Sequence, residues 1–401
     1  MSELRDKTPD EIFGERVKGH LAGLPPKADG LKLSKLTRRE FEPALARRVA
    51  ELHTLRQRGA SKFGSVLPFY FTRKGVEQAS PYFVAEYRAR RIAEQFPKCN
   101  ILDATCSIGA DSLAFARAGL QPIACDLDLF LLRCARENLK DAGFEPRVLQ
   151  ADAAFPAVQA EIYFADPDRR AEGKRTSNPE HWSPKLSQVI EAARRFSAGV
   201  VKMPPALEMD RTELPERASV SWISYDRRLF ETTLWLGDLA RTARREAVVL
   251  QADGSAVCLA EGPENCPPLA PEEARSIGWI AEADPAVLRA GLLGNVAKKL
   301  GLAPLAAEIA YLGGLEKPPS SDLARVWPVL GITSVHPRPV RALLAEHDIG
   351  PLVVKKRGHP DDAETLAKRL RGKGQKRGIL FVSRLADGHA AYLVGPPEGS
   401  Q

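Results

Sequence analysis

The chain has 401 residues, 44% of them hydrophobic and 27% charged, and it carries a formal net charge of +7. That length accommodates about two to four domains with cores of their own. No run of about 18 or more apolar residues occurs, so we expect no membrane span, and the charged N-terminus is unlike a signal peptide. The six cysteines show no Cys-x-x-Cys spacing, which indicates free thiols in a reducing cytoplasm and no zinc or other metal site.

The positive charge is concentrated at the two ends of the chain. Residues 1–78 hold 16 Lys and Arg against 10 Asp and Glu, and the last 74 residues hold 12 against 7, whereas 79–327 carry a net charge of −4. Two basic flanks suit a polyanionic partner such as a nucleic acid. A surface of mixed charge with no such partner is the alternative.

The first 78 residues are expected to be helical. Apolar residues recur at helical spacing over 37–58, with arginines on the other face, and the prolines of GLPPKADG interrupt the pattern before this helix. A further helix is expected over 81–95.

From residue 100 onward, short apolar runs alternate with helical segments. The expected strands are 100–106, 121–128, 146–152, 160–168 and 198–204, and the expected helices are 110–119, 129–143 and 184–196. Such alternation is typical of βαβ units and a parallel sheet. Segments 219–237 and 245–262 have no helix between them, and we expect them to form an antiparallel pair at the sheet edge. The proline-rich 263–274 then leads to a small mixed segment and a final α+β unit.

The turn after the first expected strand, ILDATCSIGAD, carries small residues and one glycine. Thr105 and Ser107 let the backbone approach a ligand, and Gly109 allows a tight turn. Asp103 closes this strand, and Asp126 ends the next one 23 residues later, where a carboxylate can accept both hydroxyls of a ribose. Ligands bind at this edge of an open parallel sheet. The pattern suits either a dinucleotide or S-adenosylmethionine.

Two acidic residues beside the turn favour S-adenosylmethionine. A pyrophosphate needs several glycines and no neighbouring negative charge. Here Asp103 adjoins the turn and Asp111 lies in the first turn of the helix, so the two carboxylates repel a pyrophosphate but can hold the ammonium group of a methionine moiety.

The ends of the next two expected strands carry further acceptors. Asp152 is placed to accept from the adenine amine, and Asp166 and Pro167 end the fourth strand. Their carboxylate and rigid carbonyls can hold a substrate N–H and align its nitrogen with the methyl group, in a reaction where positioning does most of the work. A strand-ending turn without function is the alternative.

These successive motifs resemble those of class I S-adenosylmethionine-dependent methyltransferases. The segment IGPLVVKKRGHPDDAETLAKRLRGKG resembles the C-terminal module of bacterial methyltransferases with a THUMP-like domain. The resemblance implies an α/β fold: a Rossmann-like sheet, an N-terminal helical region, and small C-terminal ferredoxin-like and THUMP-like α+β domains. It implies RNA, tRNA or rRNA, as the substrate. The expected domains are 1–78 (helical), 79–265 (methyltransferase), 270–325 (ferredoxin-like) and 326–398 (THUMP-like).

Asp166-Pro167-Asp168-Arg169 departs from the Asp-Pro-Pro-Tyr/Phe motif of enzymes that methylate exocyclic base amines. The aromatic partner of a flipped base is missing, and Trp182 is a candidate to replace it, although packing explains this residue equally well. The expected contacts to RNA phosphates are made by cations near the cleft and by a cluster in the C-terminal module: Arg169, Arg170, Lys202, Lys355, Lys356 and Arg357.

Six further cations follow this cluster between residues 368 and 377. The leading hypothesis is therefore an RNA base methyltransferase. A methyltransferase acting on protein or a small molecule, and a non-catalytic RNA-binding protein with a decayed cofactor site, are the alternatives.

Overall fold

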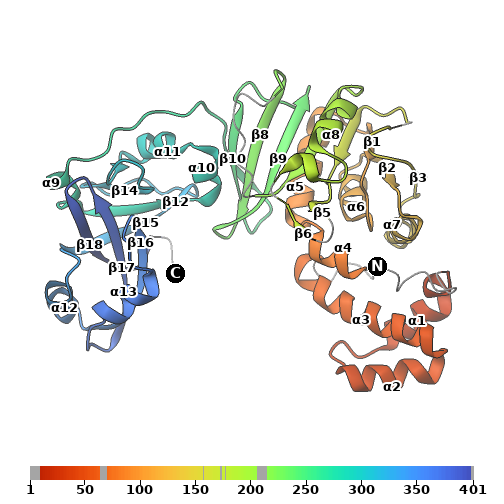
Figure 1. Cartoon of the computed structure of the whole chain (residues 1–401), viewed down its shortest axis with the longest axis horizontal. Helices are drawn as coiled ribbons and strands as arrows, with labels where there is room; N and C mark the ends of the chain where they lie inside the picture. Colours follow the sequence, from red (N-terminus) through yellow and green to blue (C-terminus); the bar gives the residue numbers. More distant parts are fainter. Residues whose placement is uncertain are drawn as a thin grey trace. The chain divides into compact units, whose positions relative to one another are not determined.

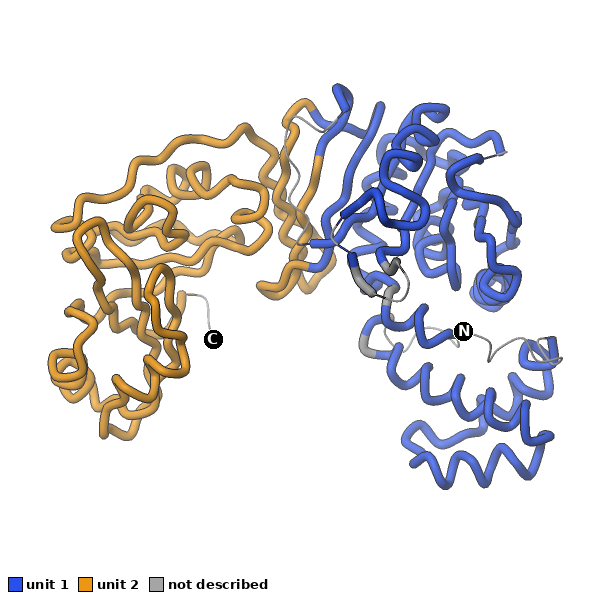
Figure 2. The backbone as a smooth tube through the Cα atoms, viewed as in Figure 1, with its two compact units in different colours: residues 1–219, 230–241 blue, residues 220–229, 242–401 orange. Residues whose placement is uncertain are grey.

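The computed structural model describes residues 10–63, 70–156, 158–171, 174–176, 178–205 and 215–398. The chain divides into two compact units (Figure 2). The first comprises residues 1–219 and 230–241, and the second comprises 220–229 and 242–401. The boundaries of these two units differ from those of the four expected domains. The four domains stay predictions.

The first unit begins with helices, as predicted (Figure 1). After a 3-10 turn, Glu11–Phe13, these are α1 (Glu15–Gly23), α2 (Gly30–Glu40), α3 (Pro43–Phe63), α4 (Arg73–Gln78) and α5 (Tyr82–Gln95). Asp29 caps α2 by accepting from the Lys32 amide at 2.8 Å. A single helix over 37–58 was the wrong prediction: Phe41 is extended and Pro43 begins α3, a position that suits proline.

A largely parallel sheet follows, with strand order β9-β7-β4-β1-β2-β3 in this unit. Its strands are β1 (Asn100–Asp103), β2 (Gln121–Asp126), β3 (Val148–Gln150), β4 (Ile162–Ala165), β7 (Ala198–Met203) and β9 (Arg228–Gly237). Only β9 runs antiparallel, against β7. The helices along the sheet are α6 (Ala110–Arg117), α7 (Leu129–Asp141) and α8 (Leu186–Ala193). This is the predicted Rossmann-like arrangement, and its parallel strands all end at one edge.

Two large apolar clusters of the described residues contribute to the core of this unit. Ala89 of α5, Phe115 of α6, and Phe164 and Val200 of the central strands form one of them. The N-terminal helices share the other with the first turn of the sheet, because Ile108 packs in the same cluster as apolar residues of α1 to α3. The N-terminal helical region thus packs against this end of the sheet through a shared apolar cluster.

Beyond the parallel strands, the structure corrects the expected antiparallel pair. Asp226 and Arg227 have positive φ angles, and they divide segment 219–237 into β8 (Ala218–Tyr225) and β9. In the second unit, β10 (Arg245–Leu250) runs parallel to β8 and antiparallel to β11 (Ala256–Leu259). Period-two patterning indicates strands but not which neighbour each strand chooses.

The rest of the second unit has the predicted α+β character, but one seven-stranded sheet includes strands from both of the segments expected to be separate domains. The order of this sheet is β13 (Ala303–Pro304), β14 (Tyr311–Gly314), β12 (Trp279–Ala283), β15 (Ala324–Thr333), β18 (Gly388–Val394), β17 (Lys376–Leu385) and β16 (Ile349–Arg357). Helices α9 (Pro271–Ala274), α10 (Pro285–Ala290), α11 (Leu293–Leu300), α12 (Pro337–Glu346) and α13 (Ala363–Leu370) accompany it.

All six cysteines are free thiols, and four of them are buried. None of the helices in the described part of the chain has the length and apolarity needed to cross a bilayer. Within the same residues, no three side chains of the metal-ligating types come together as a possible ion site.

Candidate active site

A cavity of about 460 Å³ lies in the first unit at the carboxyl ends of the parallel strands. Most predicted site residues of this unit line it: Thr105, Ser107, Asp111, Asp126, Asp152, Asp166, Pro167, Arg169 and Trp182. The sheet topology brings these residues together from segments that are far apart in the sequence. Asp103, Gly109 and Lys202 lie outside the lining, and the side chain of Arg170 lies outside the described residues.

The turn between β1 and α6 has a fixed geometry. Gly109 caps α6 with φ of 81°, and a Cβ there would come within 3.0 Å of Ala135, so only glycine fits. The Ser107 amide donates to Asp126 Oδ2 at 2.9 Å, and Oδ1 of Asp126 accepts from the Asp128 amide at 2.9 Å. Burial raises the pKa of Asp126, and these backbone bonds oppose the rise. The turn therefore orients the Asp126 carboxylate.

Asp103 is fully buried beneath this turn. Ser112 Oγ donates to its Oδ2 at 2.5 Å, whereas Oδ1 has no hydrogen-bond partner among the described residues. Burial, followed by the charge of Asp111, raises the pKa of Asp103 to about 8. The unpartnered oxygen leaves this carboxyl group able to form a further hydrogen bond beneath the turn.

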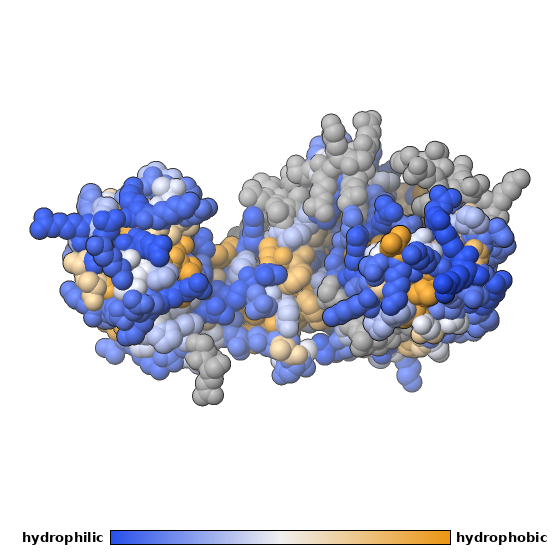
Figure 3. All heavy atoms as spheres, turned by 90° about the horizontal axis from the view of Figure 1, so that it is seen from below, coloured by the Kyte–Doolittle hydropathy of each residue, from blue (hydrophilic) through white to orange (hydrophobic). Residues whose placement is uncertain are grey.

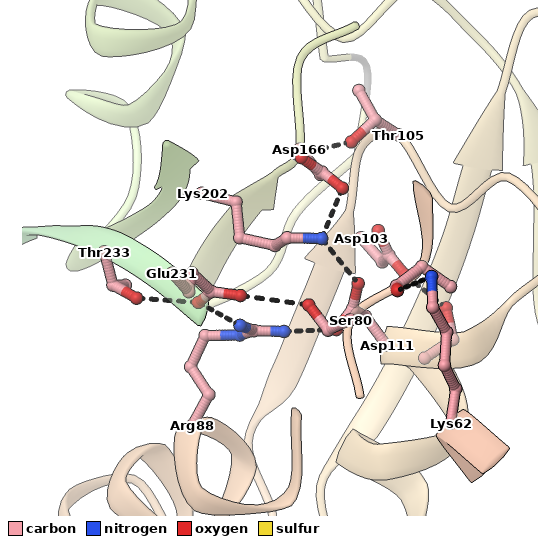
Figure 4. Close-up of polar contacts among 12 residues, drawn as sticks. Lys62, Ser80, Arg88, Asp103, Thr105, Asp111, Asp166, Lys202, Glu231 and Thr233 are labelled. Atoms are coloured by element: carbon pink, nitrogen blue, oxygen red, sulfur yellow. Dashed lines mark hydrogen bonds and ion pairs between the residues drawn. The ribbon is translucent and has the colours of Figure 1, made fainter. Parts of the chain in front are cut away.

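Lys202 joins two of the predicted acids (Figure 4). Its Nζ donates to Asp166 Oδ2 and lies 3.8 Å from Asp111 Oδ2. Burial lowers the pKa of Lys202, but the negative charges of Asp166 and Asp111 raise it. The charges outweigh burial, so the pKa lies above its usual value. The Asp166 amide donates to Thr105 Oγ1 at 2.6 Å, which ties the end of β4 to the β1–α6 turn. The sequence suggested a phosphate contact for Lys202, and the structure places it under the carboxylates instead.

A fully buried arginine extends this network. Arg88 of α5 donates to both Glu231 of β9 and Asp111 (Figure 4). Ser80 and Thr233 also donate to Glu231, at 2.9 and 2.8 Å. The two carboxylates raise the pKa of Arg88 against the opposing effect of burial. Sequence reasoning missed these residues, since nothing in the run YRARR marks which arginine is buried.

Helix α4 supplies one wall of the cavity, which the sequence did not predict. Thr72, Lys74 and Gly75 line it, and a Cβ on Gly75 would lie 3.0 Å from the Ile108 side chain. Buried Asn138 of α7 fastens this segment: its Nδ2 donates to the Ile108 carbonyl at 2.8 Å, and its Oδ1 accepts from the Tyr70 amide at 2.7 Å. The N-terminal helical region is therefore part of the site.

The loop after β4 forms another part of the cavity wall. The backbones of Asp168 and Ser183 form an isolated bridge with two 2.9 Å hydrogen bonds. Trp182 is only 3% exposed, and its Nε1 donates to the Thr176 carbonyl at 3.3 Å. The ring is thus packed into the loop, as the packing alternative predicted, and it also lines the cavity; stacking of Trp182 on a base stays a prediction.

The C-terminal cluster lies in β16 of the second unit and is largely paired. Lys355 Nζ donates to Glu282 Oε2 at 2.5 Å, and Arg357 lies 3.7 Å from the same carboxylate. Lys356 donates to the His359 carbonyl at 2.8 Å. Glu282 is 73 residues away from Lys355 in the sequence, so a local charge pattern could not reveal this pairing.

The acids at the strand ends fit a cationic cofactor. Asp111, Asp126, Asp152 and Asp166 all line the cavity, and Asp103 lies beneath them. Such a set of carboxylates suits ammonium and sulfonium groups and hydroxyl donors, and it disfavours a pyrophosphate.

Comparison with known proteins agrees with this donor set. Residues 324–396 match the THUMP domain-like family. Uncharacterized S-adenosylmethionine-dependent methyltransferases of Mycobacterium tuberculosis, one each from strains H37Rv and CDC 1551, are 30% identical over 355 residues, which cover 86% of this chain and 95% of theirs. A protein of Porphyromonas gingivalis W83 that is assigned to the methyltransferases has a crystal structure similar to this one, with a TM-score of 0.74. The match covers 96% of this chain and 98% of that one, at 16% sequence identity, and it supports the fold. The chain therefore belongs to the S-adenosylmethionine-dependent methyltransferases and uses S-adenosylmethionine as its cofactor.

Proposed function

We propose that the protein methylates a base in structured RNA, either tRNA or rRNA. The observation that carries the RNA assignment is the basic segment of the module that matches the THUMP domain-like family. There Arg371 and Lys373 follow α13, Lys376 and Arg377 begin β17, and all four are exposed. Cations in such a row suit phosphate contacts, which position RNA without reading its sequence. Figure 3 shows one face of each unit, and hydrophilic residues predominate on both faces.

The cofactor is assigned to the acids at the strand ends. Asp126 is expected to accept the ribose hydroxyls, because lone pairs remain on its two bonded oxygens. Asp152 is expected to accept from the adenine amine, and Asp103 and Asp111 to hold the ammonium group. When bound, S-adenosylmethionine supplies the methyl group.

The substrate nitrogen is assigned to the end of β4. The Asp166 carboxylate, which Lys202 fixes while Thr105 holds the Asp166 backbone amide, accepts an N–H of the base, and Pro167 presents its carbonyl beside it. The side chain of Asp166 is 32% exposed, so a substrate can reach it. Asp166 and Pro167 contribute mainly by holding the substrate nitrogen in line with the donor methyl group.

Two bonds of the turn favour a working cofactor site over a decayed one. Thr105 and Ser107 occupy positions where related turns carry glycine, and each has a structural partner: Thr105 Oγ1 accepts from Asp166, and the Ser107 amide donates to Asp126. The Thr105 side chain thus adds a contact that glycine cannot make, and the Ser107 backbone keeps the amide contact that a glycine at this position would make. A protein or small-molecule substrate remains the alternative for the acceptor.

The test is mass spectrometry of modified nucleosides in RNA from a strain that lacks the protein, compared with the wild type. We expect one methylated nucleoside to disappear and to return when purified protein and S-adenosylmethionine are added. Asp166→Asn should not restore it, while its affinity for the cofactor, measured by calorimetry, changes no more than a few-fold. Asp238→Asn, a change in a surface pair, is the matched control and should restore it. Unchanged nucleosides would contradict the RNA assignment.

A further inference from the structure

Charges around the active-site cavity are divided between two groups. The acids described above stand at the ends of the strands and the start of α6. Three cations that also line the cavity, Lys74, Arg169 and Lys185, come from α4, the loop after β4 and the residue before α8. We call these three residues the rim cluster.

Asp168 shows that the rim cluster gathers at one place. Lys74 Nζ donates to Asp168 Oδ2 at 2.7 Å, and Arg169 is the next residue in the chain. The backbone bridge from Asp168 to Ser183 brings in Lys185, which lies two residues beyond Ser183. Lys74 therefore contacts the same loop on which Arg169 and Lys185 lie.

The rim cluster carries more positive charge than its carboxylate neighbours balance. Among the described residues, Arg169 and Lys185 make no ion pair, and Asp166 is engaged by Lys202. Glu180 of the same loop is bonded to Ser187 and to no cation of the described residues. The Lys74 side chain is 52% exposed and Lys185 is exposed, so an anion can reach both. This end of the cavity is suited to an anionic ligand.

Lys74 is held in place by contacts behind it. Thr72 caps α4 by accepting from the Gly75 amide at 2.9 Å, and Lys62 donates to the Val76 and Glu77 carbonyls at 2.7 and 2.8 Å, where the helix ends. Together with the bonds of Asn138, these contacts fix α4 against the cofactor turn. A cation on such a helix is pre-organised for a ligand at the cavity mouth.

We propose that the rim cluster binds the phosphate groups that flank the methylated nucleotide. The inference rests on the proposed function, because it takes the substrate to be RNA. Asp166 then receives the base at the inner end of the cavity, while the cations hold the backbone at the rim. Trp182, which precedes Ser183, also lines this cavity. The N-terminal helical region thereby contributes a substrate contact through Lys74.

The test is methylation kinetics with the RNA isolated from the deletion strain, at several salt concentrations. The double variant Lys74→Ala/Lys185→Ala should raise the KM for RNA about tenfold or more, since two charge-assisted contacts are lost. The dependence of log affinity on log salt should flatten by about 0.7 per lost contact. The Kd for S-adenosylmethionine should stay within about twofold of the wild-type value.

Lys35→Ala/Arg194→Ala is the matched control, because it also removes two exposed cations from the first unit without touching the cavity. The single variant Lys185→Ala keeps the test independent of folding. Lys185 makes no ion pair among the described residues, and its backbone N–H still donates to the Gln188 side chain in the variant. A KM and salt slope equal to those of the control would overturn the rim-cluster proposal while RNA methylation stands. A wild-type protein that methylates no RNA would overturn the proposed function and this proposal together.

Discussion

The buried ion pair of Arg88 gives the sharpest prediction of stability. Arg88 is 0% exposed, and its partners Glu231 and Asp111 are 4% and 12% exposed at their side chains. Replacing Arg88 with Met keeps much of the volume, but it leaves buried Glu231 without its ion-pair partner and leaves Asp111 with only the more distant Lys202, at 3.8 Å. Removing one partner of a buried pair costs about 3–5 kcal/mol, because the remaining charge is uncompensated. We expect the first unit to lose that much of its free energy of unfolding.

A surface pair of the same unit provides the comparison. Arg217 donates to Asp238, and their side chains are 70% and 46% exposed. Water already solvates both groups, so Arg217→Met should cost about 0–1 kcal/mol. The two substitutions are chemically identical, and burial is the difference that matters.

The assay is native-state hydrogen exchange read by mass spectrometry on peptides from β7 and β9, which reports the unfolding of this unit separately from the other. Adding Glu231→Gln to Arg88→Met should recover part of the loss, because the unpaired charge of Glu231 is removed. A cost for Arg88→Met no larger than that for Arg217→Met would refute the electrostatic reasoning, as would a double variant less stable than the single one.

Three further predictions concern the acids and the basic segment. Asp126→Ala should weaken S-adenosylmethionine binding about tenfold or more by calorimetry, since charge-assisted hydrogen bonds contribute about 1.5–3 kcal/mol; unchanged affinity in a folded variant would move the ribose site elsewhere. Because the pKa of Asp103 is raised to about 8, the folded state keeps a proton that the unfolded chain releases above about pH 4. The free energy of unfolding therefore falls as the pH rises from about 4 to about 8, by up to about 1.4 kcal/mol per pH unit. Asp103→Asn should abolish this slope in urea unfolding at pH 5 to 8, and parallel curves would contradict it. Replacing Arg371, Lys373 and Arg377 with Ala should weaken binding to many RNAs alike and flatten its salt dependence by about 0.7–0.9 per lost contact; equal slopes would make this segment a solvated surface.

Much of the fold and part of the site followed from local patterns. Alternating strands and helices predicted the parallel sheet, and acids at successive strand ends predicted that Asp126, Asp152 and Asp166 meet at one edge, because parallel strands all end there. Such inferences need only the order of elements along the chain.

Contacts between distant segments could not be predicted in this way. Arg88 and Glu231 are 143 residues apart, and a buried arginine has no local signature that separates it from its exposed neighbours. Lys355 was expected to face RNA, yet Glu282 from another strand of the sheet binds it. Pairings of this kind depend on strand order and tertiary packing, which outweigh the local charge pattern.

The Asn138 contact has a practical consequence for how this protein can be divided. A fragment that starts at β1 would keep every predicted cofactor acid but lose Tyr70, the Asn138 partner, and the α4 wall of the cavity. It would also uncover the apolar surface around Ile108 and Cys134, which the N-terminal helices bury. Exposed apolar patches of that kind promote aggregation. Recombinant catalytic fragments, and chimeras that exchange only the sheet, should therefore carry the chain from the N-terminal helices onward.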